Sequence, residues 1–316
     1  MRVLVTGAAG FIGSHTVEAL LARGDAVLGL DNFNAFYDPA LKRRNVASLI
    51  KDSRFSLIEG DITDPRALDA AFAEPLDAVI HLAAWAGVRP SIDRPDIYVD
   101  VNVRGTLDLL ERMRRARIDR FVFASSSSVY GGRETVPFVE TDPVDRPISP
   151  YAATKKAGEV LSYTYHHLHG LNVSALRFFT VYGPRQRPEM AIHKFATQMV
   201  RGEPIALYGD GSTARDYTFI DDIVQGVLAS LDRCVGYEIY NLGEAETTRL
   251  DALIAKLGQA LGVAPKLYHA PLQPGDVPIT FADIGKARAK LGYAPSTKID
   301  AGLARFAAWF HREGVR

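Results

Sequence analysis

Tyr151 and Lys155 are the two residues whose types and spacing suggest chemistry most directly. They stand four positions apart near the start of Pro150–His169, a segment whose pattern predicts a long helix. Side chains at i and i+4 lie on one face of a helix, so the phenol and the ammonium group should face the same site. A phenol has a pKa of about 10 in water, and a nearby positive charge favours its ionised form. The pair therefore predicts a tyrosine that exchanges a proton with a substrate.

A run of serines, Ser125–Ser128, directly follows a predicted strand at Arg120–Ala124. In open α/β sheets the carboxyl ends of parallel strands face the ligand crevice. A hydroxyl from this run can therefore share a substrate proton with Tyr151. Ser126 and Ser128 are the two candidates, and the sequence leaves the choice between them open.

The start of the chain predicts a dinucleotide site. A short β-branched strand is followed by Gly7-x-x-Gly10-x-x-Gly13 and then by a predicted helix. Glycines let the backbone approach a pyrophosphate, and the helix N-terminus offers N–H groups to it. Asp31 ends the second predicted strand, where a carboxylate suits a ribose and repels a 2′-phosphate. This arrangement favours NAD over NADP, and the basic residues of Leu41–Arg44 either touch the cofactor or are solvated.

The elements that position these residues alternate between strand and helix. Apolar strands separated by helices predict a parallel sheet covered on both faces, a Rossmann-type doubly wound α/β fold. After about Gly183 the elements become shorter and Pro/Gly punctuation denser, which predicts a smaller C-terminal α/β domain. We expect the dinucleotide domain at 1–177, with about 217–242 returning to it, and the substrate domain mainly at 178–316. The predicted strands are Arg2–Thr6, Ala26–Leu30, Phe55–Ile58, Ala78–Leu82, Arg120–Ala124 and Val173–Phe179, and the predicted helices are Phe11–Arg23, one from about Pro65, Pro95–Arg117 and Pro150–His169.

Composition excludes several other classes of protein. Lys+Arg and Asp+Glu both number 37, so the chain lacks the basic excess that nucleic acid or an anionic membrane surface requires. No apolar run approaches the roughly 18 residues of a membrane span. The single cysteine, Cys234, and an N-terminus without a signal-peptide pattern lead us to expect a cytoplasmic protein. His166 and His169 share a helix face near His167, but no third ligand is evident, so no metal is expected.

These motifs together resemble the extended short-chain dehydrogenase/reductase family over essentially the whole chain. They read TGAAGFIGSH, Asp31, Gly60-Asp61-Ile62, HLAA, Asn102, SSSSVYGG, YAATK and RFFTVYGP. The resemblance implies NAD as the cofactor and a homodimer built on the helices Pro95–Arg117 and Pro150–His169. The cofactor contacts that we expect are Gly7, Gly10, Phe11, Ile12, Gly13, Asp31, Asn32, Arg43, Asp61, Ile62, Leu82, Ala83, Ala84, Asn102, Tyr151 and Lys155.

The resemblance also narrows the reaction. Family members begin by oxidising a sugar 4-hydroxyl, and those that then dehydrate or decarboxylate the sugar carry acidic residues just before the Val-Tyr dipeptide. This chain has Ser127 and Ser128 at those positions. Neither serine can act as the carboxylate acid or base of those steps. The expected reaction is therefore 4-epimerisation, in which bound NAD oxidises carbon 4 transiently and is regenerated.

The expected substrate is a UDP-sugar. The segments NFNAFYDPALKRRN, HLAAWAGVRPSI and FFTVYGPRQRPEMAIHKF are more similar to UDP-glucuronate 4-epimerases than to UDP-glucose 4-epimerases. The resemblance places Arg215 on the diphosphate and Asp276 on the uridine ribose, with Thr180 where galactose-type epimerases usually carry Asn. We hypothesise that Arg185 contacts the sugar carboxylate together with Ser127 or Ser128. Arg187 and Arg89 are further candidates for that contact.

Two alternatives stay open at this stage. The chain could act on UDP-glucose and UDP-galactose, or on an N-acetylated or another uronic UDP-sugar, and Trp85, where the family pattern leads us to expect Gln, could reshape the sugar pocket. A catalytically silent nucleotide-sensing module is the alternative of another class. Loss of the tyrosine or the lysine would favour such a module, and both residues are present.

Overall fold

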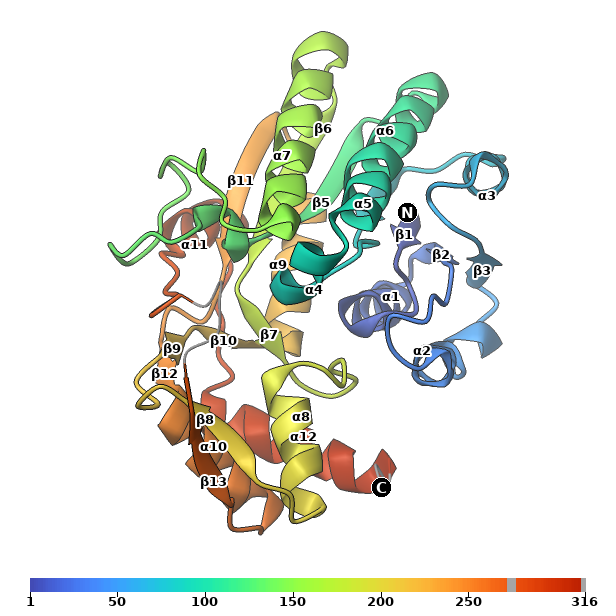
Figure 1. The fold of residues 1–316 in the computed structure, drawn as a ribbon. Coiled ribbons are helices and arrows are strands. Elements are labelled where there is room, and N and C mark those ends of the chain that lie inside the picture. The colour runs from blue at the N-terminus through green and yellow to red at the C-terminus, as the bar shows by residue number, and fades with distance from the viewer. Residues whose placement is uncertain (272–276, 314–316) are drawn as a thin grey trace.

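The structure, a computed structural model, describes residues 1–271 and 277–313. Its centre is a seven-stranded sheet in the order β11-β6-β5-β4-β1-β2-β3, in which every neighbouring pair is parallel (Figure 1). This order confirms the predicted Rossmann-type fold class. The strands are β1 (Arg2–Thr6), β2 (Ala26–Asp31), β3 (Phe55–Glu59), β4 (Ala78–His81), β5 (Arg120–Ser126), β6 (Asn172–Phe178) and β11 (Tyr237–Leu242).

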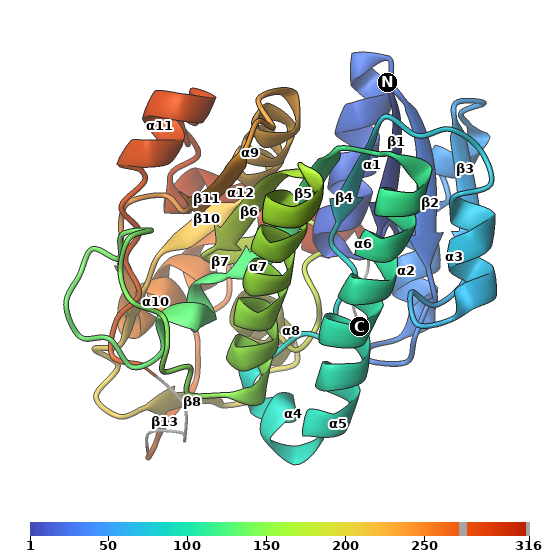
Figure 2. The same ribbon diagram turned by 90° about the horizontal axis from the view of Figure 1, so that it is seen from above.

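Helices cover both faces of this sheet, as Figure 2 shows from above. One layer contains α3, α6 and α7, and its core packs Leu109, Leu110 and Met113 against Phe121 and Phe123. The opposite layer contains α1, α9 and α11. The helices are α1 (Phe11–Arg23), α2 (Pro39–Val46), α3 (Pro65–Ala71), α4 (Val88–Asp93), α6 (Gly105–Ala116), α7 (Pro150–His169), α9 (Ile220–Asp232) and α11 (Gly285–Leu291).

The predicted helix Pro95–Arg117 is confirmed as one continuous helical segment, from Pro95 to Ala116, but its middle is not α-helical. The structure has a short α-helix, α5 (Pro95–Tyr98), then a π-helical segment at Val99–Arg104, and only then α6. A π turn widens the helix locally and often marks a functional position. Here it contains the buried Asn102, whose side chain bonds to the backbone of a neighbouring loop.

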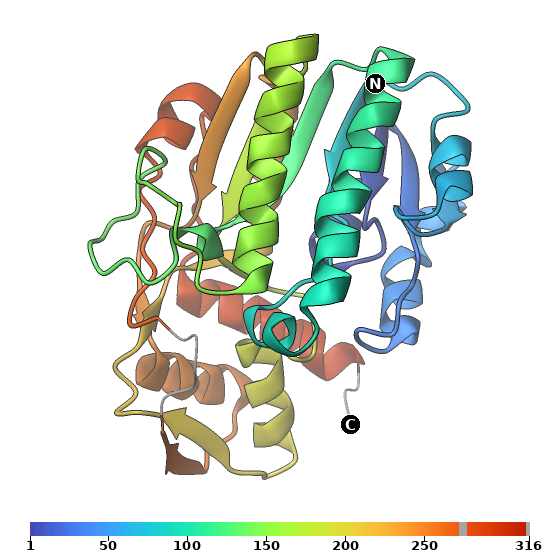
Figure 3. The same cartoon turned by 45° about the horizontal axis from the view of Figure 1, so that its top comes forward.

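The smaller domain lies beyond the carboxyl ends of the central strands (Figures 1 and 3). Three helices and short strand pairs form it. After β10 (Tyr217–Phe219), the segment 220–242 leaves this region, because it supplies α9 and the edge strand β11 of the large sheet. The elements are α8 (Ala191–Val200), α10 (Leu250–Leu261), α12 (Ile299–Glu313), and the pairs β7 (Thr180–Tyr182) with β10 (Tyr217–Phe219), β8 (Ile205–Tyr208) with β13 (Leu267–Ala270), and β9 (Ala214–Arg215) with β12 (Thr248–Arg249).

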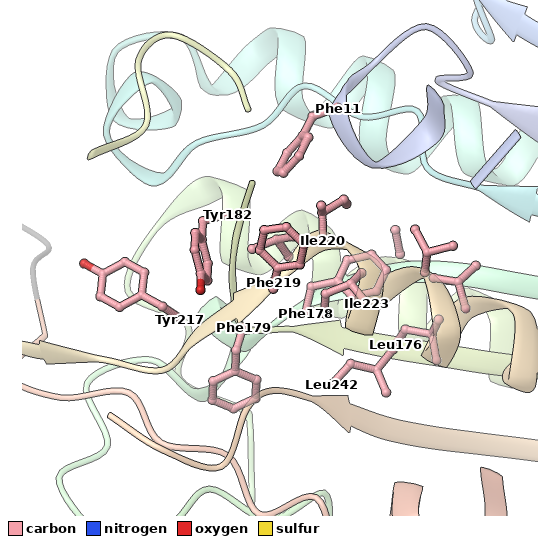
Figure 4. Close-up of a cluster of buried hydrophobic side chains, with 14 of the residues drawn as sticks. Phe11, Leu176, Phe178, Phe179, Tyr182, Tyr217, Phe219, Ile220, Ile223 and Leu242 are labelled. Carbon is pink, nitrogen blue, oxygen red and sulfur yellow. The ribbon is translucent and has the colours of Figure 1, made fainter. Parts of the chain in front are cut away.

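One apolar cluster joins the two domains. Phe11 of α1 lies near Phe219 and Ile220, while Tyr182 and Tyr217 continue the cluster toward the smaller domain (Figure 4). All five side chains are buried. Because protein interiors are close-packed, this shared core holds the strand ends of one domain at a defined place against the loops of the other.

Candidate active site

A cavity of about 590 Å³ lies between the two domains, at the carboxyl ends of the central strands. Its wall contains the glycine turn at one end, Tyr151 and Lys155 in the middle, and Arg187 and Arg215 from the smaller domain. Ligands of open α/β folds bind at this edge of the sheet. The cavity therefore brings together most of the residues that the sequence singled out.

The glycine turn has the tight geometry that a phosphate site needs. Gly7 has a φ of +69°, and a Cβ on Gly13 would lie 1.9 Å from the Gly7 carbonyl oxygen. No larger residue fits at Gly13 unless the loop moves. Asp31 fixes the turn from the next strand, because its carboxylate accepts hydrogen bonds from the backbone N–H groups of Ala9 and Phe33, both at 2.9 Å. Burial raises the pKa of Asp31, whereas these two hydrogen bonds favour its ionised form.

The far end of the cofactor region is built from Asp31, Asn32, Asp61 and Ile62, all of which line the cavity. The Asn32 side chain donates to Asp61 at 2.6 Å, which links the ends of β2 and β3. Arg43 departs from its predicted place in this group. Its guanidinium pairs with Glu59 at 2.7 Å and lies over the Phe33 ring, outside the cavity wall.

The next part of the wall is Leu82, Ala83 and Ala84, directly after β4. Asn102 stands behind this wall rather than in it. Its side chain accepts from the Trp85 N–H at 2.7 Å and donates to the Trp85 carbonyl at 2.9 Å. The predicted cofactor residue Asn102 is thus placed to fix the loop that follows Ala84.

Tyr151 and Lys155 both lie on the cavity side of α7. The Lys155 Nζ donates to the Ala124 carbonyl at 2.7 Å, and burial lowers the pKa of this ammonium group to about 7. Burial raises the pKa of the Tyr151 phenol, while a hydrogen bond with Ser126 and the charge of Arg187 act in the opposite direction. In the protein without cofactor, burial therefore outweighs these two effects, and the expectation that Lys155 and a positively charged nicotinamide together lower the pKa of this phenol stays a prediction.

The choice between Ser126 and Ser128 is partly resolved by their surroundings. Ser126 bonds to the Tyr151 phenol, and its Oγ also accepts from the Ser128 N–H at 3.1 Å. Ser128 Oγ is buried in the cavity wall and, within the described residues, has no hydrogen-bond partner. A buried hydroxyl without a partner is costly unless a ligand supplies one. Ser126 thus lies beside the Tyr151 phenol, and Ser128 presents an unpartnered hydroxyl in the cavity wall.

A buried ion pair supports the serine run from below. Ser125 Oγ donates to Glu159 Oε1 at 2.6 Å, and Arg177 binds both oxygens of the same carboxylate at 2.9 and 3.0 Å. Burial alone would raise the pKa of Glu159, but the Arg177 guanidinium holds it below its usual range. This network joins β5, β6 and α7 directly beneath the site, so it fixes the strand end that carries Ser126.

The substrate end of the cavity is lined by Arg89, Ser127, Thr180, Arg187 and Arg215. Arg185, the predicted carboxylate contact, is not among these residues. It has a φ of +65°, and its guanidinium pairs with Glu18 of α1 at 2.9 Å. The hypothesis for Arg185 therefore lacks geometric support, whereas Arg187, two positions later, faces the cavity. Asp276 lies outside the described residues.

Phe36, Tyr37, Lys42 and Glu189 are among the cavity residues that the sequence did not single out. Lys42 donates through Nζ to the carbonyl and the side chain of Asn34, both at 2.9 Å. Tyr37 Oη is buried and, in the described part of the chain, has no hydrogen-bond partner. The basic run Leu41–Arg44 indicated that a basic side chain lies near the cofactor, but the sequence pattern alone could not show that Lys42, and not Arg43, lines the cavity.

Two negative findings apply to residues 1–271 and 277–313. No group of three or more His, Cys, Asp or Glu side chains there could hold a metal ion, and the three histidines of α7 are among those searched. Within the same residues, no helix has the length and apolar character to cross a membrane.

The fold and the cavity together are those of an enzyme of the short-chain dehydrogenase/reductase type, which uses a dinucleotide cofactor. Residues 3–243 match the model of the NAD dependent epimerase/dehydratase family, and the chain belongs to that family. Its sequence is 47% identical over 308 residues to UDP-glucuronate 4-epimerase of Thermodesulfobacterium geofontis. The aligned residues cover 97% of this chain and 95% of that protein. These findings confirm the resemblance inferred from the motifs.

Solved structures show how widely this architecture is shared. UDP-glucuronic acid 4-epimerase from Bacillus cereus, in complex with UDP-glucuronic acid and NAD, matches with a TM-score of 0.93 and 38% identity, covering 99% of this chain and 100% of that one. A double mutant of the dTDP-glucose 4,6-dehydratase DesIV from Streptomyces venezuelae, with NAD and DAU bound, also has a TM-score of 0.93, at 33% identity and full coverage of both chains. The fold alone therefore does not separate epimerase from dehydratase, and the side chains of the cavity must do so.

Proposed function

We propose that this protein is an isomerase that interconverts UDP-glucuronate and UDP-galacturonate by 4-epimerisation. One observation carries the proposal: a single cavity brings together the glycine turn, the hydrogen-bonded Tyr151 and Ser126, and Arg187. The relatives that carry the name UDP-glucuronate 4-epimerase support it. Serines at positions 127 and 128, rather than carboxylates, favour epimerisation over dehydration or decarboxylation.

The residues of the cofactor region fit NAD. Gly7, Gly10 and Gly13 leave room for a pyrophosphate, and the N-terminus of α1 faces the same space. Asp31 is the acceptor for ribose hydroxyls, and Asp61 and Ile62 flank the adenine. Leu82, Ala83 and Ala84 form the wall on the nicotinamide side, together with Tyr151 and Lys155. When bound, NAD supplies the reversible oxidation at carbon 4.

Tyr151 acts as the base that removes the proton of the sugar 4-hydroxyl and later returns it. Burial raises the pKa of this phenol, so the protein by itself favours its neutral form. The positive charge of oxidised NAD and the ammonium form of Lys155 are the charges that favour ionisation in the complex. Ser126, already bonded to the phenol, holds it in place and shares the proton.

The sugar carboxylate binds to Arg187, with hydroxyls from Ser127, Ser128 and Thr180 around it. The observations that support this assignment are the position of Arg187 in the cavity wall and the unpartnered Ser128 Oγ. Arg187 also lies close enough to Tyr151 to influence its pKa. Arg215 binds the diphosphate, and Arg89 is a second candidate for that contact.

A carboxylate clamp is needed because a uronate oxidised at carbon 4 is a β-keto acid. Such acids lose carbon dioxide readily when the bond to the carboxylate aligns with the π system of the ketone. Arginine binds a carboxylate through a rigid planar fork, so it can hold this bond out of alignment. The same clamp that gives affinity for a uronate therefore protects it from decarboxylation.

The protein is proposed to be a cytoplasmic homodimer. Apolar side chains of the adjacent helices α6 and α7 are exposed, among them Leu107, Val160, Tyr163 and Leu168. Figure 3 shows these two helices side by side on one face of the molecule. An apolar face of this kind is typical of an interface between subunits. The single cysteine, Cys234, is buried and unpaired, which supports a reducing compartment.

The test is incubation of the purified protein with UDP-glucuronate and no added NAD, followed by identification of the product by NMR. We expect UDP-galacturonate, formed with cofactor that the protein retains. A UDP-pentose as the main product would overturn the proposed reaction in favour of decarboxylation. Turnover of UDP-glucose but not of UDP-glucuronate would overturn the proposed substrate.

A further inference from the structure

Arg187 is held on one side by an aromatic ring. Its guanidinium carbon lies 5.6 Å from the centre of the Phe36 ring, within the range of a cation–π contact. Glu189 makes the ion pair of Arg187, with Nε as the closest nitrogen at 3.1 Å. The Arg187 side chain is only 21% exposed to solvent. The guanidinium is therefore oriented by a ring against one face and a carboxylate near Nε.

Phe36 is itself fixed from behind. Its ring meets Trp85 edge-on, with the ring centres 5.5 Å apart and an angle of 77° between the planes. The Phe36 N–H donates to the Asn34 side chain at 3.1 Å, and Lys42 donates to the same side chain. The π-helical Asn102 holds Trp85 through both its N–H and its carbonyl. The ring under Arg187 thus has little freedom to move.

An uncharged support suits an arginine that must bind an anion. Glu189 already occupies Nε, and a second carboxylate in the position of Phe36 would compete with the substrate for the remaining N–H groups. An aromatic face attracts the cation through its quadrupole and leaves the in-plane N–H groups available. Phe36 comes from the loop after β2, which also carries Asn32 of the cofactor region, so the same loop serves both ends of the cavity.

We infer that Phe36, supported by Trp85, is a specificity-determining residue that positions Arg187 for a substrate carboxylate. This inference rests on the proposed function. It gives Trp85 a role as the support of Phe36, since the ring of Phe36 and not that of Trp85 lines the cavity. The consequence is a selective effect: loss of the Phe36 ring weakens binding of a sugar that carries a carboxylate and spares a neutral one.

The test measures dissociation constants for UDP-glucuronate and UDP-glucose by calorimetry, in a Tyr151→Phe background that binds without turnover. Adding Phe36→Leu is expected to weaken UDP-glucuronate binding by about tenfold and to leave UDP-glucose binding unchanged. Phe36→Tyr keeps the ring and should restore the wild-type preference. Trp85→Leu should cause a smaller loss of the same selective kind. Bound NAD, measured in every variant, reports on folding.

The outcomes separate the inference from the proposed function. If the background protein prefers UDP-glucuronate and Phe36→Leu keeps that preference, the inference is wrong and the proposed substrate stands. Equal weakening of both ligands also overturns the inference, because it would show a purely structural role. If the background protein binds both ligands equally, carboxylate recognition fails, and the inference fails with it.

Discussion

The two halves of the cavity, one proposed to bind the cofactor and the other the substrate, are built in different ways. The cofactor half is formed mainly by the backbone of the turn Gly7–Gly13 and by strand ends that are neighbours in one sheet. The substrate half is formed by side chains, among them Ser128, Thr180, Arg187 and Arg215, from segments far apart in the chain.

This difference explains how one scaffold serves several reactions. A turn that binds through N–H groups depends on the absence of side chains, so it changes little when the substrate changes. The substrate half can change its preference through one or two replacements, because each contact belongs to one side chain. The equal TM-scores of the epimerase and the dehydratase structures agree with this division.

Replacement of Gly13 should have the largest effect, because it damages the half that every reaction shares. A Cβ at this position would lie 1.9 Å from a backbone oxygen, so Gly13→Ala must displace the turn. We expect a protein that purifies without NAD and has no activity. Gly132→Ala is the control, since a Cβ there meets nothing within 4 Å. Normal NAD content in Gly13→Ala would show that the turn does not bind the cofactor.

Tyr151→Phe removes the phenol hydroxyl that exchanges the proton and keeps the aromatic ring in the cavity wall. We expect turnover of UDP-glucuronate to fall about a thousandfold, the scale of general base catalysis. Bound NAD should stay at the wild-type level, which distinguishes this variant from Gly13→Ala. Turnover is followed by NMR, and NAD is measured after denaturation. A variant with near-wild-type turnover would remove Tyr151 from its assigned role.

Lys155 lies where the two halves meet, and its burial predicts a dependence of stability on pH. Its pKa is about 7 in the folded protein. Because the unfolded value is about 10.4, the unfolded chain binds the extra proton between these limits, and stability rises with pH across that window. Between pH 7 and pH 9.5, the free energy of unfolding of the NAD-free wild type should rise by about 3 kcal/mol relative to that of Lys155→Met.

Urea unfolding of both NAD-free proteins at the two pH values measures this gain. Both proteins carry the Tyr151 phenol, whose pKa is raised by burial, so its titration largely cancels in the comparison. If the unfolding free energies of the two proteins differ by the same amount at both pH values, Lys155 does not titrate between pH 7 and pH 9.5.

Arg187 and Arg185 test the substrate half with a matched pair. Arg187→Ala should raise the KM for UDP-glucuronate by about 30-fold, since a hydrogen bond to a charged group contributes about 2 kcal/mol. Arg185→Ala removes a partly exposed ion pair with Glu18 and a long hydrogen bond to Ser14, at 3.5 Å, and should change KM by about twofold or less. Steady-state kinetics of the two variants show which of the two arginines contacts the sugar carboxylate. The reverse ranking would restore the original hypothesis for Arg185.

The cofactor half could be predicted from the sequence because its signals are local. Strand, glycine turn and helix follow one another, and Asp31 ends the next strand, so hydrophobic periodicity and turn residues were enough. The predicted helices Phe11–Arg23 and Pro150–His169 match α1 and α7 at both ends. The same local rules missed the π-helical segment, because its sequence continues an ordinary helical pattern.

The substrate half could be predicted only in part, because its geometry depends on single backbone angles and on distant packing. Arg185 and Arg187 differ by two positions, and the positive φ of Arg185 accompanies its pairing with Glu18 of α1. No spacing rule shows this. Phe36 and Trp85 become partners only when the loops after β2 and β4 meet.

A competition experiment tests whether the substrate half selects for the carboxylate while the cofactor half serves any sugar nucleotide. UDP-glucuronate and UDP-glucose are mixed at equal concentration with the protein, and both products are followed by NMR in the same tube. We expect that UDP-galacturonate forms while UDP-glucose stays unconverted. Conversion of both sugars at equal rates would contradict it.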